Sequence, residues 1–236
     1  MTLNLLIIDT ETTGIDSTVD SVIEIGAILY SVNCKTTLSQ LSFLLHATDN
    51  AAEHINRIPP VALTHIPNAL QERSLDLLGN MAANASYVVA HNAAFDAQWF
   101  DDKHLPIIRG NNHQPLKWLC SMADMTWPKQ TRPGESLINL ALYHGIGVSS
   151  AHRALTDCQL LAELFSRLSS NELADLIAQS LRPKAVFKAE VSYDDRHLAK
   201  EAGFRWNPDS KTWTRKMAIE DAAQLPFQTT SIQLLH

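Results

Sequence analysis

The sequence predicts the α/β fold class: a mixed sheet flanked by helices, followed by a small α+β appendage. Along residues 1–181, short apolar runs typical of buried strands alternate with stretches whose apolar residues recur every three or four positions, as in amphipathic helices. After Arg182-Pro183, apolar and polar residues alternate instead. The chain of 236 residues is long enough for one mid-sized domain, which we place at 1–181, and a smaller unit at 182–236.

The first domain is expected to open with an antiparallel meander. Apolar runs predict strands near residues 3–9, 21–32 and 35–46, the last two joined by a short turn. The stretch 53–65 contains Pro59-Pro60 and is expected to be irregular. The remaining elements are predicted as a helical segment within 68–85, a strand at 86–90, a helix from 93, a strand near 115–119, and helices at 120–127, 136–144, 153–168 and 171–181.

The C-terminal unit is predicted to be a small β-α-β-β module. Residues 186–193 alternate apolar and polar side chains, which indicates a half-exposed strand. Asp194 or Asp195 caps a short helix that ends at Gly203. Residues 204–206 and 212–214, separated by a polar turn, then predict a hairpin.

Two acidic residues end the first strand. Asp9 and Glu11 follow the apolar run Leu5-Leu6-Ile7-Ile8, and because strand side chains alternate between faces, they project to the same side. Two neighbouring carboxylates repel each other, which raises the pKa of one of them unless a cation lies between them. Unpaired charges at the end of a buried strand are costly, so the pair predicts a divalent metal site.

Two further segments supply acidic residues. Asp96 lies about one turn into the helix that Asn92 is expected to cap, and Asp157 lies in a strongly amphipathic helical pattern. His152 shares a site with Asp157 only if it precedes the helix or lies in its first turn, because five helical residues would turn the two side chains roughly 140° apart. Taken singly, Asp96 and Asp157 are better explained as solvated helix charges. Their joint occurrence with Asp9 and Glu11 favours a metal-dependent nuclease.

The order D-x-E, N-x-x-x-D and H-x-x-x-x-D, over roughly residues 3–170, resembles the DEDDh family of 3′–5′ exonucleases. The resemblance implies a ribonuclease H-like fold and two Mg²⁺ or Mn²⁺ ions. Asp9, Glu11 and Asp157 would hold one ion, Asp9 would bridge to a second ion steadied by Asp96, and His152 would be the general base. The resemblance also suggests substrate contacts at Thr12, Thr13, Gly14, His91, Asn92 and Phe95. A simple turn explains Gly14 equally well, and a core position is the better explanation of Phe95. His91 has no consistent spacing from the acids, so spacing alone indicates an ordinary surface or loop residue.

The expected activity is metal-dependent hydrolysis of phosphodiester bonds at the 3′ end of nucleic acid, with single strands as substrate and DNA favoured over RNA. Nucleoside 5′-monophosphates would be the products. The alternative is a catalytically silent adaptor of the same fold that binds nucleic acid or protein. The complete set of acids and the histidine favour activity.

Composition sets the remaining expectations. An apolar content of 45% with 19% charged residues is ordinary for globular proteins. The N-terminal apolar run is too short for a signal peptide or a membrane span, so we expect a cytoplasmic protein with no membrane partner. The three cysteines are expected to be buried, reduced thiols.

Basic charge concentrates in the C-terminal unit. The net charge is −6, yet residues 182–236 hold 9 lysines and arginines against 7 acids, whereas residues 1–181 hold 10 against 18. Trp206 and Trp213 lie among these basic residues, which suits stacking of single-stranded nucleic acid. A unit of this size also needs tryptophans for its core, and we expect burial of both. A polymerase or another protein partner is the third possible use of this unit.

Overall fold

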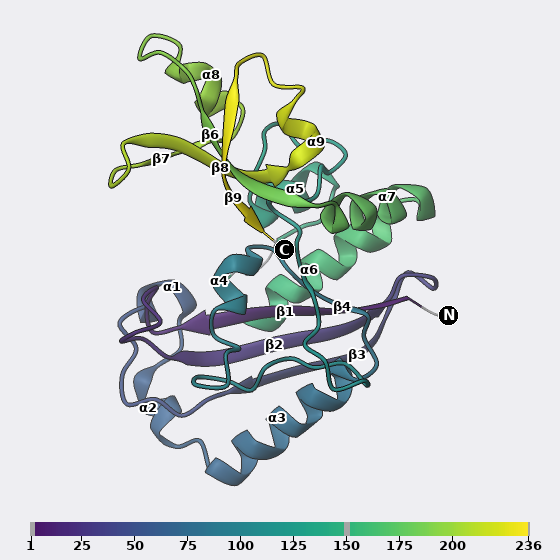
Figure 1. Cartoon of the computed structure of the whole chain (residues 1–236). Helices are drawn as coiled ribbons and strands as arrows, with labels where there is room; N and C mark the ends of the chain where they lie inside the picture. Colours follow the sequence, from purple (N-terminus) through teal and green to yellow (C-terminus); the bar gives the residue numbers. More distant parts are fainter. Residues whose placement is uncertain (1–2, 149–151, 236) are drawn as a thin grey trace.

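The computed structural model describes residues 3–148 and 152–235 of the chain (Figure 1). A five-stranded mixed sheet with the order β3-β2-β1-β4-β5 forms its centre. β1 pairs with β2 and β2 with β3 in antiparallel fashion, whereas β4 lies parallel to β1 and β5 parallel to β4. The strands are β1 (Asn4–Thr12), β2 (Val22–Ser31), β3 (Thr36–Leu44), β4 (Tyr87–Ala90) and β5 (Trp118–Cys120).

Helices cover both faces of this sheet. α3 (Asn68–Ala82) packs on β2 and β3, and α6 (Ala154–Arg167), with α5 (Leu137–Tyr143) beside it, packs on β1 and β2 from the other side. Alternate residues of β1 supply the two cores: Leu5 and Ile7 face α6, and Leu6 and Ile8 face α3. This arrangement confirms the predicted α/β class.

Most predicted elements form. α4 (Ala93–Ala97) begins at the expected residue, and α7 (Ser170–Leu181) starts with a capping box between Ser169 and Glu172. The stretch predicted as irregular instead contains two short helices, α1 (Glu53–Asn56) and α2 (Pro60–Thr64).

The helix predicted at 120–127 is wrong, because this stretch forms turns. The Ser121 amide donates to the carbonyl of Ala90, which continues the β4–β5 ladder, and the Trp127 indole N–H donates to the carbonyl of Ser121 at 2.7 Å. The Trp127 ring also stacks on Phe165 of α6 with centroids 5.4 Å apart. These tertiary contacts override the local helical pattern.

The C-terminal unit forms a four-stranded sheet of its own, with the order β7-β8-β6-β9. The predicted β-α-β-β series is present, and α9 and β9 extend it beyond the prediction. Phe187, Phe204 and Met217 are buried in a separate core cluster. The elements are β6 (Lys184–Ala189), α8 (Arg196–Glu201), β7 (Arg205–Asn207), β8 (Thr212–Ala218), α9 (Ile219–Ala222) and β9 (Thr229–Leu235).

Two of the contacts that join this unit to the preceding part of the chain involve Lys184 and Gly203. The Lys184 ammonium lies 3.1 Å from the Asp124 carboxylate, and both side chains are largely buried. Gly203 packs so closely that a methyl group there would meet the Pro133 ring at 3.0 Å. Both contacts involve the stretch between β5 and α5.

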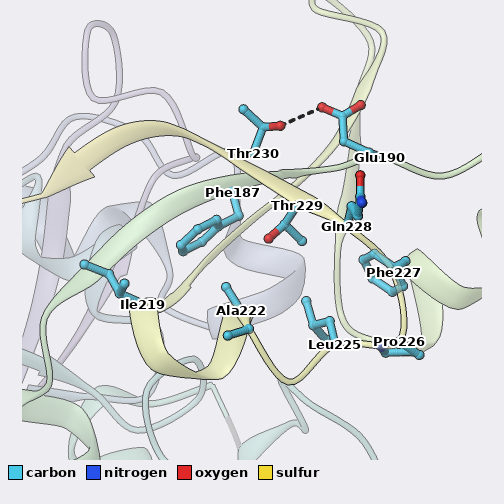
Figure 2. Close-up of a pocket in the computed structure, with 11 residues that line it drawn as sticks. Phe187, Glu190, Ile219, Ala222, Leu225, Pro226, Phe227, Gln228, Thr229 and Thr230 are labelled. Atoms are coloured by element: carbon cyan, nitrogen blue, oxygen red, sulfur yellow. Dashed lines mark hydrogen bonds between the residues drawn. The ribbon is translucent and has the colours of Figure 1, made fainter.

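A cavity of about 650 Å³ opens between β6, α9 and the start of β9 (Figure 2). Phe187, Leu225 and Phe227 give it an apolar wall, and the hydroxyl of Thr230 donates to Glu190 at 2.9 Å at its rim. None of the predicted site residues lines this cavity. Among the described residues, no helix is long and apolar enough to cross a membrane.

Candidate active site

Three of the predicted acids converge at the end of β1. One carboxylate oxygen each from Asp9, Glu11 and Asp157 lies within 4.8 Å of the other two. Asp9 and Glu11 project from the same strand two residues apart, and Asp157 comes from the first turn of α6. The structure therefore brings together residues that are almost 150 positions apart in the chain.

Gly26 makes this convergence possible. It lies on β2 directly opposite Asp9, and a methyl group at its Cα would come within 2.3 Å of the Ala154 backbone. The start of α6 thus lies against the bare backbone of β2, which brings Asp157 beside β1. Any larger residue at this position would push the helix, and with it one of the three carboxylates, away from the sheet.

Asp96 lies on α4, next to the three converging acids. Only 2% of it is exposed, and its Oδ1 accepts hydrogen bonds from the Thr10 amide at 3.0 Å and the Thr10 hydroxyl at 2.8 Å. Burial raises the pKa of Asp96 to about 7, against the lowering effect of the Thr10 hydrogen bonds. Asp96 is near enough to raise the pKa of Asp9, although its oxygens do not belong to the group of three.

The electrostatics of this cluster favour a cation. Burial raises the pKa of Asp9 well above its usual value, and the charges of Asp96 and Asp157 raise it further. Burial and the charge of Asp157 raise the pKa of Glu11 to about 8. Hard carboxylate oxygens at this spacing fit Mg²⁺ or Mn²⁺, whose charge would offset the mutual repulsion of the acids.

His152 precedes α6, as its spacing from Asp157 requires. The residue is exposed and has a positive φ of 63°, a backbone conformation that is uncommon for a residue with a side chain. Its charge and its backbone N–H both lower the pKa of Asp157, against the raising effect of burial. His152 therefore lies beside the acid cluster at the edge open to solvent.

Glu24 and Arg153, which the sequence reasoning did not single out, hold this edge in place. Glu24 lies on β2 opposite Glu11 and is 2% exposed. Its carboxylate accepts two hydrogen bonds from the Arg153 guanidinium, at 2.8 and 2.9 Å, and one from the Ala154 amide at 3.2 Å. This bidentate pair fixes the residue after His152 and the first turn of α6. A signal was available in the sequence, since Glu24 is a charged residue inside an apolar strand.

The predicted substrate contacts differ in their surroundings. Thr12 and Thr13 are buried, the Thr13 amide donates to the carbonyl of Ser21, and a methyl group at Gly14 would collide with the Asp20 carboxylate at 2.3 Å. A larger residue at this position would displace the Asp20 carboxylate, which accepts hydrogen bonds from the Thr13 hydroxyl and the Asp16 amide within the turn. Whether this backbone also approaches a nucleotide stays a prediction.

The other three candidates surround α4. Asn92 is exposed, and Phe95 is partly exposed with its edge against Trp99. His91, which sequence spacing alone suggested to be an ordinary loop residue, is instead enclosed. Its Nε2 donates to the carbonyl of Glu135 at 3.0 Å, and its Nδ1 consequently accepts from the Ser121 hydroxyl at 2.9 Å. Both ring nitrogens are thus engaged within the protein, which favours a positioning role.

Comparisons with known proteins agree with this geometry. Residues 6–165 match the family described as Exonuclease (RNase_T). The chain belongs to this exonuclease family. It is 31% identical over 169 residues to the DNA polymerase III subunit epsilon of Treponema pallidum. The aligned region covers 68% of this chain and 74% of that protein. The resemblance to the DEDDh family is confirmed, and the protein is a 3′–5′ exonuclease.

Solved structures show the same fold. A complex of E. coli exonuclease I with single-stranded DNA matches with a TM-score of 0.59 and 17% identity, covering 88% of this chain and 52% of that one. The nuclease domain of 3′hExo, a DEDDh family member bound to rAMP, matches with a TM-score of 0.53 and 13% identity, covering 70% of this chain and 90% of that one. Residues 185–232 match a family described as a domain of unknown function.

Two expectations need correction. Trp206 is 50% exposed, although it was expected to be buried. Cys34 is exposed, because it lies in the turn between β2 and β3, whereas Cys158 is buried and Cys120 is partly buried. All three thiols are free, as expected.

Proposed function

We propose that this exonuclease is metal-dependent and removes nucleotides from the 3′ ends of single-stranded DNA. Residues 1–181 form the catalytic domain in this proposal. The observation that carries it is the convergence of Asp9, Glu11 and Asp157 oxygens within 4.8 Å, where burial and mutual repulsion keep their pKa values raised until a cation is present.

The acids have separate tasks in this proposal. Asp9, Glu11 and Asp157 would hold one Mg²⁺ or Mn²⁺, and Asp9 and Asp96 would hold a second. When bound, the two ions supply a more acidic attacking water and stabilise the charge on the departing 3′-oxygen. Asp96 keeps β1 in place through Thr10, so that Asp9 and Glu11 remain aligned with Asp157.

His152 is the proposed general base. It takes a proton from the water that attacks the terminal phosphorus, the bond between phosphorus and the 3′-oxygen breaks, and a nucleoside 5′-monophosphate leaves. Imidazole is the side chain that most often acts as a general base in such proton transfers. The Glu24–Arg153 pair limits the movement of the neighbouring backbone, so His152 stays at the cluster.

The experiment is hydrolysis of a 5′-labelled single-stranded oligonucleotide, as DNA and as RNA, with Mg²⁺, with Mn²⁺ and with chelator. We expect labelled products that become progressively shorter from the 3′ end only when metal is present, and we expect hydrolysis of DNA to be faster than hydrolysis of RNA. The variant Asp157→Asn should abolish it, whereas Asp175→Asn on the exposed side of α7 should not. Binding without cleavage under every condition would refute the proposal and identify the chain as a silent adaptor.

The polymerase subunit relative suggests a proofreading or repair setting in the cytoplasm. That relative is a subunit of DNA polymerase III, and we propose a polymerase as a partner through residues 182–236. Co-purification of this chain with a replicative polymerase, with and without residues 182–236, tests that association.

A further inference from the structure

The C-terminal unit exposes aromatic and cationic side chains on one surface. Tyr193 is 78% exposed and Trp206 is 50% exposed, whereas Phe187 and Phe204 of the same unit are buried. Trp206 lies edge-on to Trp213 with ring centroids 5.8 Å apart. We call Tyr193, Arg196, Lys200, Trp206 and Trp213 the aromatic-cationic surface.

This surface is hollowed. A depression of about 520 Å³ is lined by Asp194, Arg196, His197, Lys200 and Trp213. The Arg196 guanidinium lies 3.9 Å from the centroid of the Tyr193 ring and donates to the Tyr193 carbonyl at 2.6 Å. These two interactions hold the guanidinium at the rim before any ligand arrives, and Asp194 is the single acidic residue among the five that line the depression.

Charge indicates the kind of ligand. The unit 182–236 has 9 lysines and arginines against 7 acids, whereas the remaining chain has 10 against 18. An exonuclease whose catalytic part is this acidic gains little attraction for a polyanion from that part, even with two divalent cations bound. The C-terminal unit is where favourable phosphate contacts are available.

We propose that the aromatic-cationic surface binds the single-stranded part of the substrate that lies 5′ of the terminal nucleotide. Bases would stack on Trp206 and Tyr193, and Arg196 and Lys200 would contact phosphates, without sequence preference. When the 3′-terminal nucleotide lies at the acid cluster, every other nucleotide of the strand lies on its 5′ side. A second contact surface on this protein can therefore bind only those 5′ nucleotides. This inference rests on the proposed function for its substrate.

The unit is joined to the catalytic part in a way that suits this task. The Lys184–Asp124 ion pair and the packing of Gly203 on Pro133 fix the orientation of β6 and α8 relative to the stretch between β5 and α5. Two rigidly joined contact surfaces hold a strand more tightly than either does alone, because the second contact becomes intramolecular.

The first test is binding without cleavage. Fluorescence anisotropy of a labelled 20-nucleotide oligothymidylate is measured with the full-length protein in chelator. We expect Trp206→Ala and Tyr193→Ala each to raise the Kd roughly 5- to 150-fold, because stacking contributes about 1–3 kcal/mol per base. Arg196→Gln and Lys200→Gln should each reduce the slope of log K against log salt by about 0.7.

Matched controls come from α3, which covers the face of the central sheet opposite to α6. Leu77 is 53% exposed and Arg73 is exposed, so Leu77→Ala and Arg73→Gln should leave Kd and salt slope unchanged. Tyr193 is too exposed for its truncation to unfold the unit, which keeps the test valid if Trp206→Ala proves unstable. Wild-type affinity in all four surface variants would overturn the proposal and leave a protein partner as the use of these side chains.

The second test separates this proposal from the proposed function. A dinucleotide has a single phosphodiester, which must lie at the acid cluster when it is cleaved. We expect Trp206→Ala to lower kcat/KM on the 20-nucleotide strand, chiefly through KM, and to leave kcat/KM on the dinucleotide unchanged. Equal losses on both substrates would overturn the surface proposal, whereas failure of the wild type to cleave either would overturn the proposed function and leave the binding result valid.

Discussion

Glu11→Gln should stabilise the metal-free protein, and the effect should grow with pH. Burial and the charge of Asp157 raise the pKa of Glu11 from 4.5 to about 8. An acid whose pKa is raised on folding binds more protons in the folded state, so the protein loses stability as the pH rises from about 4.5 through 8. Glutamine keeps the shape of the side chain and removes this penalty.

The magnitude follows from the size of the shift. A change from 4.5 to about 8 corresponds to an upper value of about 5 kcal/mol. Glu11 is partly exposed, so solvent screens part of the repulsion and we expect about 2 kcal/mol at pH 8. For a chain of this size, that is a rise in Tm of roughly 4–8 °C.

Thermal unfolding followed by circular dichroism in chelator, at pH 5 and pH 8, measures the effect. Glu11→Gln should unfold well above wild type at pH 8 and close to it at pH 5. Adding Mg²⁺ or Mn²⁺ should narrow or reverse the difference at pH 8, because the ion stabilises the wild-type carboxylates. The exposed Glu72→Gln on α3 serves as the control. A Glu11→Gln protein no more stable than wild type at pH 8 would refute the electrostatic reasoning for the site.

Four other perturbations test the remaining parts of the site. His152→Ala should lower turnover roughly 10²-fold or more with nearly unchanged metal affinity measured by calorimetry, and near-normal turnover would exclude it as the base. Gly26→Ala should lower the free energy of unfolding in urea by about 1–3 kcal/mol and remove most of the activity, because its methyl group meets the Ala154 backbone. The control Gly79→Ala on α3 has open space around it and should leave stability unchanged or increase it. Arg153→Ala should lower the free energy of unfolding by about 1–3 kcal/mol, because the buried Glu24 carboxylate loses its hydrogen bonds. It should also lower kcat more than it changes KM, whereas a purely structural pair would leave kcat unchanged in the folded protein. Burial lowers the pKa of His91 to about 4. The wild type should therefore lose up to about 3 kcal/mol of unfolding free energy as the pH falls from about 6.5 to 4, because the unfolded chain then binds one more proton than the folded protein. His91→Gln should flatten that part of the plot of stability against pH.

Local patterns were sufficient for much of the fold. The apolar runs of β1 and β2 and the three- and four-residue repeat of α6 are long and strongly periodic, and each forms close to its predicted bounds. The helix predicted at 120–127 failed because the Trp127 ring stacks on Phe165 and the Ser121 amide donates to the carbonyl of Ala90, two tertiary contacts that a single sequence does not reveal. β9 was missed because it is an edge strand rich in polar residues, without the alternation that marks β6.

The candidate site shows where sequence reasoning reaches its limit. The alternation of strand faces placed Asp9 and Glu11 on one side, and the joint occurrence of Asp96 and Asp157 with this pair indicated the remaining acids. What holds them together depends on contacts over long sequence distances: Gly26 admits the α6 backbone, and Glu24 binds Arg153. A buried carboxylate bound to an arginine is a weak source of stability, since desolvation offsets most of the attraction. In the proposed mechanism its position between Glu11 and the residue after His152 gives it a different value, because it would set the geometry of the proposed base at the cost of stability. Glu11 would show the same trade under this proposal: its burial and its repulsion by Asp157 weaken the metal-free fold, and a bound metal ion would offset that loss.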